Sequence, residues 1–167
     1  MNLAFCLVAC AVTLFSSTAQ QAPKANQLFS LTLHPLEAPV KVGAEVHLTV
    51  TVKNTSDHDL NLGFLPGPPP YQAMTYEIEV RDAEGHEAPP TALLRSLREH
   101  LGAGFQTNAG YTLPPGKSSD EQLDITKLYV LTKPGAYTIR VARRQNPLRK
   151  TDEDIVSSNP ITIRVIK

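Results

Sequence analysis

The stretch over 113–141 constrains the fold most, because turn signals and alternating apolar residues follow one another there at short intervals. It reads LPPGKSSDEQLDITKLYVLTKPGAYTIRV, and an alternating segment, SNPITIRVI, follows near the end of the chain. Between its Pro-Pro-Gly and Pro-Gly turns lie a short polar strand and one apolar turn. Closely spaced short strands of this kind predict an antiparallel β-sandwich. Activity stays open, since one fold can carry many unrelated functions.

Alternation of apolar and polar residues predicts seven strands. In the clearest one, over 45–53, Val46, Leu48, Val50 and Val52 face the core and the residues between them face water. The other six are predicted at 28–33, 60–65, 74–82, 120–125, 136–143 and 160–166, with 111–113 as an optional eighth. Val50, Tyr137, Ile139 and Ile163 are expected to share one core between two sheets.

Two short helical segments are predicted between the strands. Leucines at helical spacing indicate a surface helix over 91–101. A single helical turn over 126–131 is expected to place Leu128 and Tyr129 on the core. Tyr137, directly after a Pro-Gly turn, is expected to bind backbone across a corner, which is a packing role.

The N-terminus predicts export. The apolar run from Leu3 to Phe15 is shorter than the roughly 20 residues that span a bilayer, and Ser17-Thr18-Ala19 suits signal peptidase. We therefore expect a signal peptide over 1–19, a tether over 20–27 and the sandwich over 28–167, in a secreted or periplasmic protein. Lipid attachment at Cys10 is the alternative. Since Cys6 and Cys10 are the only cysteines, the mature chain would have no thiol.

Charge and composition limit the classes of partner. The chain has 16 basic and 16 acidic residues, all after Ala19, so the expected mature chain also has no net charge. A neutral chain with interspersed charges argues against binding to nucleic acid or to an anionic membrane. We expect a monomer with no membrane span after cleavage.

The order LPPGKS, a polar strand, DITKLYVLTKPGAYTIRV and SNPITIRV resembles small immunoglobulin-like domains of exported bacterial proteins. It is also similar to the β-sandwich segment that precedes the catalytic domain of deuterolysin-type zinc peptidases, and to the BsuPI proteinase-inhibitor domain. The deuterolysin-type resemblance implies an accessory or folding module without its enzyme, and the BsuPI resemblance implies inhibition of a serine proteinase. None of them supplies functional residues that can be placed on this chain.

Motif searches predict no catalytic, cofactor-binding or metal-binding residues. The chain has no pair of histidines at the spacing of a zinc peptidase and no Gly-x-Ser-x-Gly nucleophile motif, and Ser118-Ser119 is expected in a turn. All the histidines are expected on the surface: His34, His47, His58, His86 and His100. No cofactor is expected.

Five charged or short motifs are interpreted as structural features. The acids Asp120, Glu121 and Asp124 are expected to be solvated, and Asp152–Asp154 likewise, with calcium binding by the latter left open. The basic group Arg140, Arg143, Arg144, Arg149 and Lys150 is expected to pair with those neighbouring acids. Pro68-Pro69-Pro70-Tyr71 has the PPxY form but is expected to be a rigid loop, and Asn54-Thr55-Ser56 is a glycosylation sequon in an expected turn.

These observations predict an exported, non-catalytic binding or accessory module that contacts a protein or a cell-surface polymer. The alternative is a proteinase inhibitor that acts through an exposed loop. The segments over 65–71 (LPGPPPY) and 145–158 are the candidate loops.

Overall fold

The computed structural model describes residues 27–34, 36, 38–64, 71, 73–101, 109–146 and 152–167. The signal peptide, nearly all of the tether, Cys10 and most of the PPxY motif lie outside these residues, and so do Arg149 and Lys150. No helix in the described part of the chain is both long enough and apolar enough to cross a membrane.

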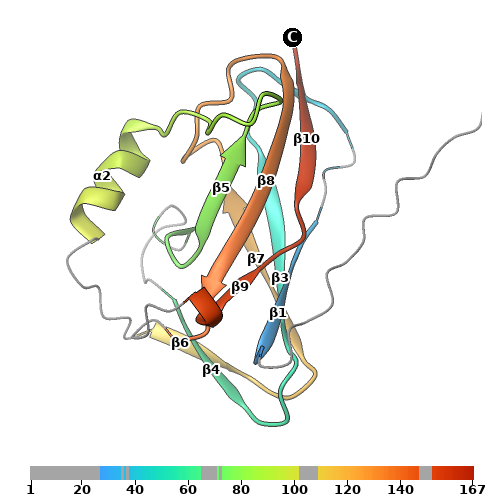
Figure 1. The fold of residues 1–167 in the computed structure, drawn as a ribbon, viewed down its shortest axis with the longest axis vertical. Helices are drawn as coiled ribbons and strands as arrows, with labels where there is room; N and C mark the ends of the chain where they lie inside the picture. Colours follow the sequence, from blue (N-terminus) through green and yellow to red (C-terminus); the bar gives the residue numbers. More distant parts are fainter. Residues whose placement is uncertain are drawn as a thin grey trace, which may run out of the picture.

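Two facing β-sheets form the body of the protein (Figure 1). The first sheet has the order β1-β3-β7, formed by Phe29–Leu33, His47–Asn54 and Ser118–Asp124. The second has the order β2-β10-β8-β5, formed by Val40–Lys41, Ile161–Ile166, Gly135–Arg144 and Glu77–Arg81, and β9 (Ile155–Ser157) pairs with β8. The prediction of an all-β sandwich with one short helix is confirmed.

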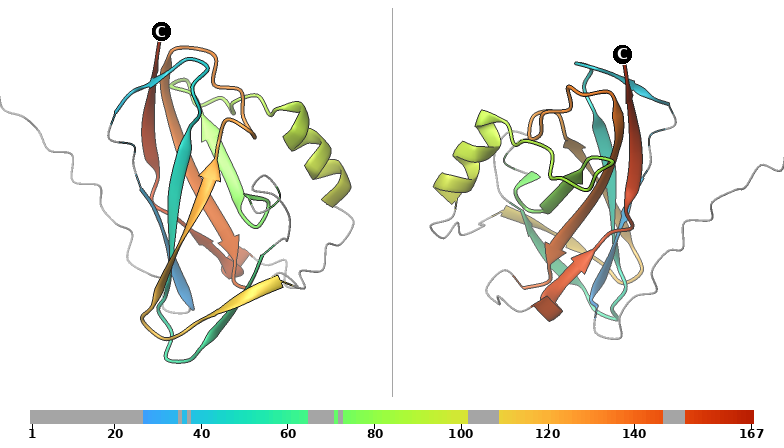
Figure 2. Two further views of the ribbon diagram at one scale, coloured as in Figure 1. Left: turned by 180° about the vertical axis from the view of Figure 1, so that it is seen from behind. Right: turned by 45° about the horizontal axis from the view of Figure 1, so that its top comes forward.

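A small third sheet lies at the end of the sandwich away from the C-terminus (Figure 1). It pairs β4 (Leu60–Phe64) with β6 (Ala109–Leu113), the strand that was the optional eighth. Seen from behind, β3 and β7 lie in front of β8 (Figure 2), so the two main sheets form separate layers.

The alternating residues build the core as predicted. Val50 faces Leu33 across β1 and β3, and Ile139 faces Ile161 across β8 and β10. The predicted core residues Val50, Tyr137, Ile139 and Ile163 are all buried. The register places one face of each strand between the sheets and the other face in water, which is the arrangement that a period of two requires.

Several predicted details are wrong. β2 runs parallel to β10 in an otherwise antiparallel arrangement, and β2 and β9 were not predicted because two or three residues cannot display a period. Ser118-Ser119 begins β7 instead of forming a turn. Asn54, expected in a turn, is instead the last residue of β3 and is fully buried.

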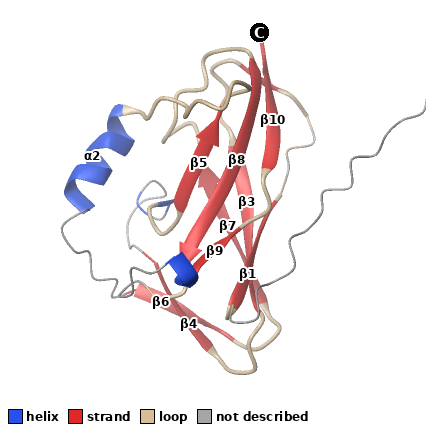
Figure 3. Ribbon diagram, viewed as in Figure 1, coloured by secondary structure: helices blue, strands red, loops and turns tan. Residues whose placement is uncertain are grey.

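The predicted surface helix is confirmed, and the structure adds a short 3-10 turn that was not predicted. The helix α2 (Ala92–Leu101) lies outside the sheets, and η1 (Asp152–Asp154) is a short 3-10 turn (Figure 3). Thr91 precedes α2, and its Oγ1 accepts a hydrogen bond from the Leu94 amide at 3.2 Å, as an N-cap does. The turn after Ile125 buries Leu128 and Tyr129.

Polar side chains fasten the connections between strands. The Asn54 amide group donates to the carbonyls of His58 and Leu113, both at 2.8 Å, and so joins the β3–β4 and β6–β7 turns. Asn159 accepts from the Leu33 amide and donates to the Leu33 carbonyl, both at 2.9 Å. The Tyr137 hydroxyl donates to the Lys133 carbonyl at 3.0 Å, which confirms its predicted packing role.

Candidate binding pocket

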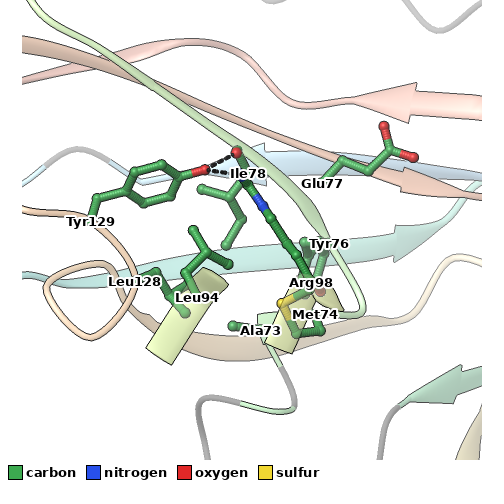
Figure 4. A pocket seen from close by; sticks show the side chains of 9 residues that line it. All are labelled: Ala73, Met74, Tyr76, Glu77, Ile78, Leu94, Arg98, Leu128 and Tyr129. Atoms are coloured by element: carbon green, nitrogen blue, oxygen red, sulfur yellow. Dashed lines mark hydrogen bonds between the residues drawn. The ribbon is translucent and has the colours of Figure 1, made fainter. Parts of the chain in front are cut away.

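A pocket of about 260 Å³ lies between α2 and the neighbouring β5 (Figure 4). The segment before β5 contributes Ala73 and Met74, α2 contributes Leu94, and the turn before β8 contributes Leu128. These residues meet there because α2 packs its apolar stripe, including the buried Leu94 and Leu97, toward the sandwich. The lining of the pocket is therefore mainly apolar.

The Tyr129 hydroxyl of the pocket is already engaged in hydrogen bonds. The Tyr129 hydroxyl donates to the Ile78 carbonyl at 2.5 Å and accepts from Arg98 Nη2 at 3.1 Å (Figure 4 draws the bond to Ile78). Burial raises the pKa of Tyr129, while Arg98 opposes that shift. A neutral hydroxyl held in this way positions β5 against the turn and is not an activated nucleophile.

Two charges border the pocket. Arg98, whose side chain is about half exposed, lies 3.6 Å from Glu87. Glu77 points away from the other lining side chains (Figure 4) and pairs with Arg144 at 3.1 Å. An apolar concavity with a charge at its rim can hold an apolar group and orient a polar one beside it.

A second polar cluster lies inside the sandwich. The Arg143 side chain is only 4 % exposed, and its Nη2 donates to the Gly63 carbonyl at 2.6 Å. Its Nη1 lies 3.4 Å from Glu121, which also accepts from the Tyr111 hydroxyl at 2.8 Å. This cluster links β8, β7, β4 and β6, so its role is to join sheets.

The same cluster contains an unpaired hydroxyl. The guanidinium of Arg143 lies 5.5 Å from the centre of the Tyr76 ring, and the Tyr76 hydroxyl is buried without a hydrogen-bond partner among the described residues. Burial raises the pKa of Tyr76, the Glu121 carboxylate raises it further, and Arg143 opposes both. Tyr76 is therefore held neutral at physiological pH.

Two predictions about charged residues are wrong. Glu121 was expected to be solvated, but its side chain is 22 % exposed and faces Arg143. Arg143 was expected to pair with Asp152–Asp154, whereas its ion pair is with Glu121 on another strand. Both errors have one cause: partners on different strands are far apart in the sequence.

The remaining predicted positions have simple placements. All five histidines are exposed, as expected. The sequon asparagine is buried, and its Oδ1 accepts from the Ser56 amide and hydroxyl. Of the segment over 145–158, residues 155–157 form β9 and pair with β8, whereas most of 65–71 lies outside the described residues. Among the described residues, Asp152–Asp154 forms no convergent set of metal-binding atoms.

The structure brings together, from two different strands, a set of residues that linear motif searches missed. Glu45, His47 and Asp124 place one potential metal-binding atom each within 4.8 Å of one another. Asp124 is remote in sequence, but two predicted strands, 45–53 and 120–125, already contained all three residues. Pairing those strands in register would have revealed the set.

Comparisons with known proteins identify no family. No protein-family model and no curated protein matches the sequence. Among solved structures, the CARDB domain of a Pyrococcus furiosus protein is 12% identical to this chain, with a TM-score of 0.42. The matched region covers 83% of this chain and 94% of the CARDB structure.

Two larger structures are similar over a part of their length. A Listeria innocua β-glucosidase is 15% identical (TM-score 0.43) over 82% of this chain and 16% of its own. A candidate lipoprotein from Bacillus subtilis is 18% identical (TM-score 0.34) over 81% of this chain and 34% of its own. This chain thus spans only a small part of those two proteins.

Proposed function

We propose that this chain is an exported, non-catalytic binding module that takes an apolar segment of a partner protein into the pocket between α2 and β5. The supporting observation is the composition of that pocket: mainly apolar side chains line it, and the Tyr129 hydroxyl is already hydrogen-bonded. Such a site offers contact area and a rim charge, Arg98, with no free nucleophile among the described lining residues.

A protein partner fits this pocket better than a cell-surface polymer does. Sugar rings are commonly held against exposed aromatic faces, whereas the two aromatic residues that line this pocket, Tyr76 and Tyr129, are 4% and 1% exposed. Apolar side chains of a protein can instead contact Met74 and Ile78, the apolar lining residues that are only partly buried.

The test is affinity capture from the native culture medium with a matched pair of variants. Met74→Arg places a charge in the pocket, and Thr162→Arg places the same charge on the exposed face of β10. We expect a partner that the wild-type chain and Thr162→Arg retain and that Met74→Arg loses. Equal retention by both variants would exclude the pocket as the binding site.

The non-catalytic part of the proposal has its own test. Purified protein would be screened against peptide, ester and glycoside substrates, with and without EDTA. We expect no turnover above that of a heat-unfolded sample. Turnover that disappears on replacing one carboxylate would establish an enzyme.

Inhibition of a serine proteinase is the alternative function, and it rests on the BsuPI resemblance alone. Pairing of residues 155–157 with β8 reduces the length of free loop available over 145–158. A titration of serine proteinases with the purified chain, monitored by residual activity, would detect stoichiometric inhibition. We expect none.

A further inference from the structure

Three side chains with metal-binding atoms meet on the outer face of the first sheet, where β3 begins and β7 ends. We propose that Glu45, His47 and Asp124 bind a divalent transition-metal ion there, with Zn²⁺ as the probe. The site lies on the outer face of the first sheet and shares no residue with the pocket beside α2.

Strand geometry brings the three residues together. His47 and Asp124 are directly opposite each other in the antiparallel register of β3 and β7. Glu45 lies two positions before His47, and the buried Val46 between them shows that both side chains point outward. His47 Nε2 and Glu45 Oε2 are 2.9 Å apart.

The distances suit a small ion. Zinc bound at 2.0–2.2 Å by nitrogen and oxygen in a tetrahedron holds its ligands about 3.3 Å apart. The three donor atoms already lie within 4.8 Å of one another. The side chains of His47 and Glu45 are 53% and 67% exposed, so both can adjust their rotamers to close the remaining distance.

Charge and orientation also favour a cation. Neither Glu45 nor Asp124 makes an ion pair with a lysine or arginine of the described residues. One oxygen of Asp124 accepts from the Thr126 hydroxyl at 2.6 Å and the Lys127 amide at 3.2 Å. Both bonds go to Oδ1 and hold the carboxylate in place, as outer contacts do in metal sites.

The donor set selects the class of metal. Imidazole is a common ligand of zinc, copper and nickel, whereas calcium takes six to eight oxygen atoms. One imidazole and two carboxylates supply three ligands, and water would complete a tetrahedron. We therefore expect zinc binding without calcium binding.

A second set on the same protein provides a matched control. Asp82, Glu84 and His86 also place donors within 4.8 Å, but within a single turn. There Asp82 Oδ1 already accepts from the amides of Glu84 at 3.1 Å and His86 at 2.8 Å. The other oxygen of Asp82 lies 3.6 Å from His86 Nδ1, so this set resembles the proposed one except that it lies within one turn and does not join two paired strands.

The experiment is zinc titration of the tag-free folded chain by calorimetry, with imidazole NMR signals to identify the histidine that responds. We expect one zinc ion per chain and a shift of the His47 signals. His47→Ala and Asp124→Asn should each weaken binding by more than about 10-fold, while His86→Ala should leave it unchanged. Asp124→Asn keeps an oxygen for the Thr126 and Lys127 bonds.

Thermal unfolding separates loss of the site from loss of the fold. Without zinc, each variant should unfold cooperatively near the wild-type temperature, since His47 is exposed. Zinc should raise the unfolding temperature of the wild type and of His86→Ala but not of His47→Ala. Absence of zinc binding, equal binding by His47→Ala, or loss on replacing His86 alone would each overturn the proposal.

Discussion

Asn54 shows how a single polar residue can hold two turns together. Its amide group satisfies one carbonyl in each turn, and its oxygen accepts two bonds from Ser56. Asn54→Ala would leave these groups without partners, and each buried polar group left unpaired costs about 1–3 kcal/mol. We expect urea unfolding to show a loss of about 2–4 kcal/mol.

Asn61 provides the control for this change. It lies on the exposed side of β4 and accepts one bond, from the Thr112 hydroxyl. Asn61→Ala should lower the free energy of unfolding by less than about 1 kcal/mol. If the two alanine variants were equally stable, Asn54 would not join the turns.

The buried Tyr76 hydroxyl predicts a pH dependence. Its raised pKa means that the unfolded chain, in which tyrosine titrates near 10, loses this proton first. The contribution of the protonated Tyr76 hydroxyl to the free energy of unfolding is therefore complete below about pH 10. It is lost as the pH rises further. Tyr76→Phe should reduce this alkaline loss, measured by thermal unfolding between neutral and alkaline pH.

Tyr76 and Tyr137 form a matched pair at neutral pH. Tyr76→Phe removes a hydroxyl without a partner in the described structure, so stability should be unchanged or slightly higher. Tyr137→Phe removes a bond to Lys133 and should cost about 1 kcal/mol. If Tyr76→Phe lost more stability than Tyr137→Phe, the Tyr76 hydroxyl would have a hydrogen-bond partner.

Ile139 and Thr138 test the register of β8. Ile139 is fully buried, so Ile139→Ala should lose about 2–5 kcal/mol through lost contacts and a cavity. Thr138 is exposed on the opposite face, and Thr138→Ala should stay within about 0.5 kcal/mol. Equal losses in denaturant unfolding would mean that the register is shifted.

Elements of the fold differ in how well the sequence predicts them. Strands β3, β8 and β10 are long enough to display a period of two, and a local pattern was enough to find them. β2 and β9 owe their conformation to pairing with β10 and β8, which no local window contains. The same limitation hid the Arg143–Glu121 pair and the proposed metal site.

The start of α2 is also its attachment to the sandwich. The Thr91 hydroxyl caps the helix and donates to the Lys127 carbonyl at 2.7 Å. Thr91→Ala should lower the free energy of unfolding by about 1 kcal/mol, the usual cost of removing such a cap. Thr91→Ser, which retains the hydroxyl, should recover most of it, and unchanged stability in the alanine variant would contradict the capping role.

For the molecule as a whole, the sequence predicted the architecture but not the pocket. Two layers follow from strands that are apolar on one face only. The pocket instead depends on where α2 docks, which is set by contacts among Leu94, Leu128 and the residues before β5. These contacts join segments that are far apart in the sequence, so no local sequence pattern contains all of them.

Asn159 has a consequence for how molecules of this protein meet one another. β1 is an edge strand, and the outward peptide groups of such a strand can pair with a strand from another copy. The Asn159 amide already occupies both peptide groups of Leu33. Asn159→Ala should therefore expose a place for intermolecular sheet growth, seen as concentration-dependent self-association in analytical ultracentrifugation. Asn61→Ala is the control and should stay monomeric under the same conditions. If Asn159→Ala also stays monomeric, Asn159 is not what prevents pairing at this edge.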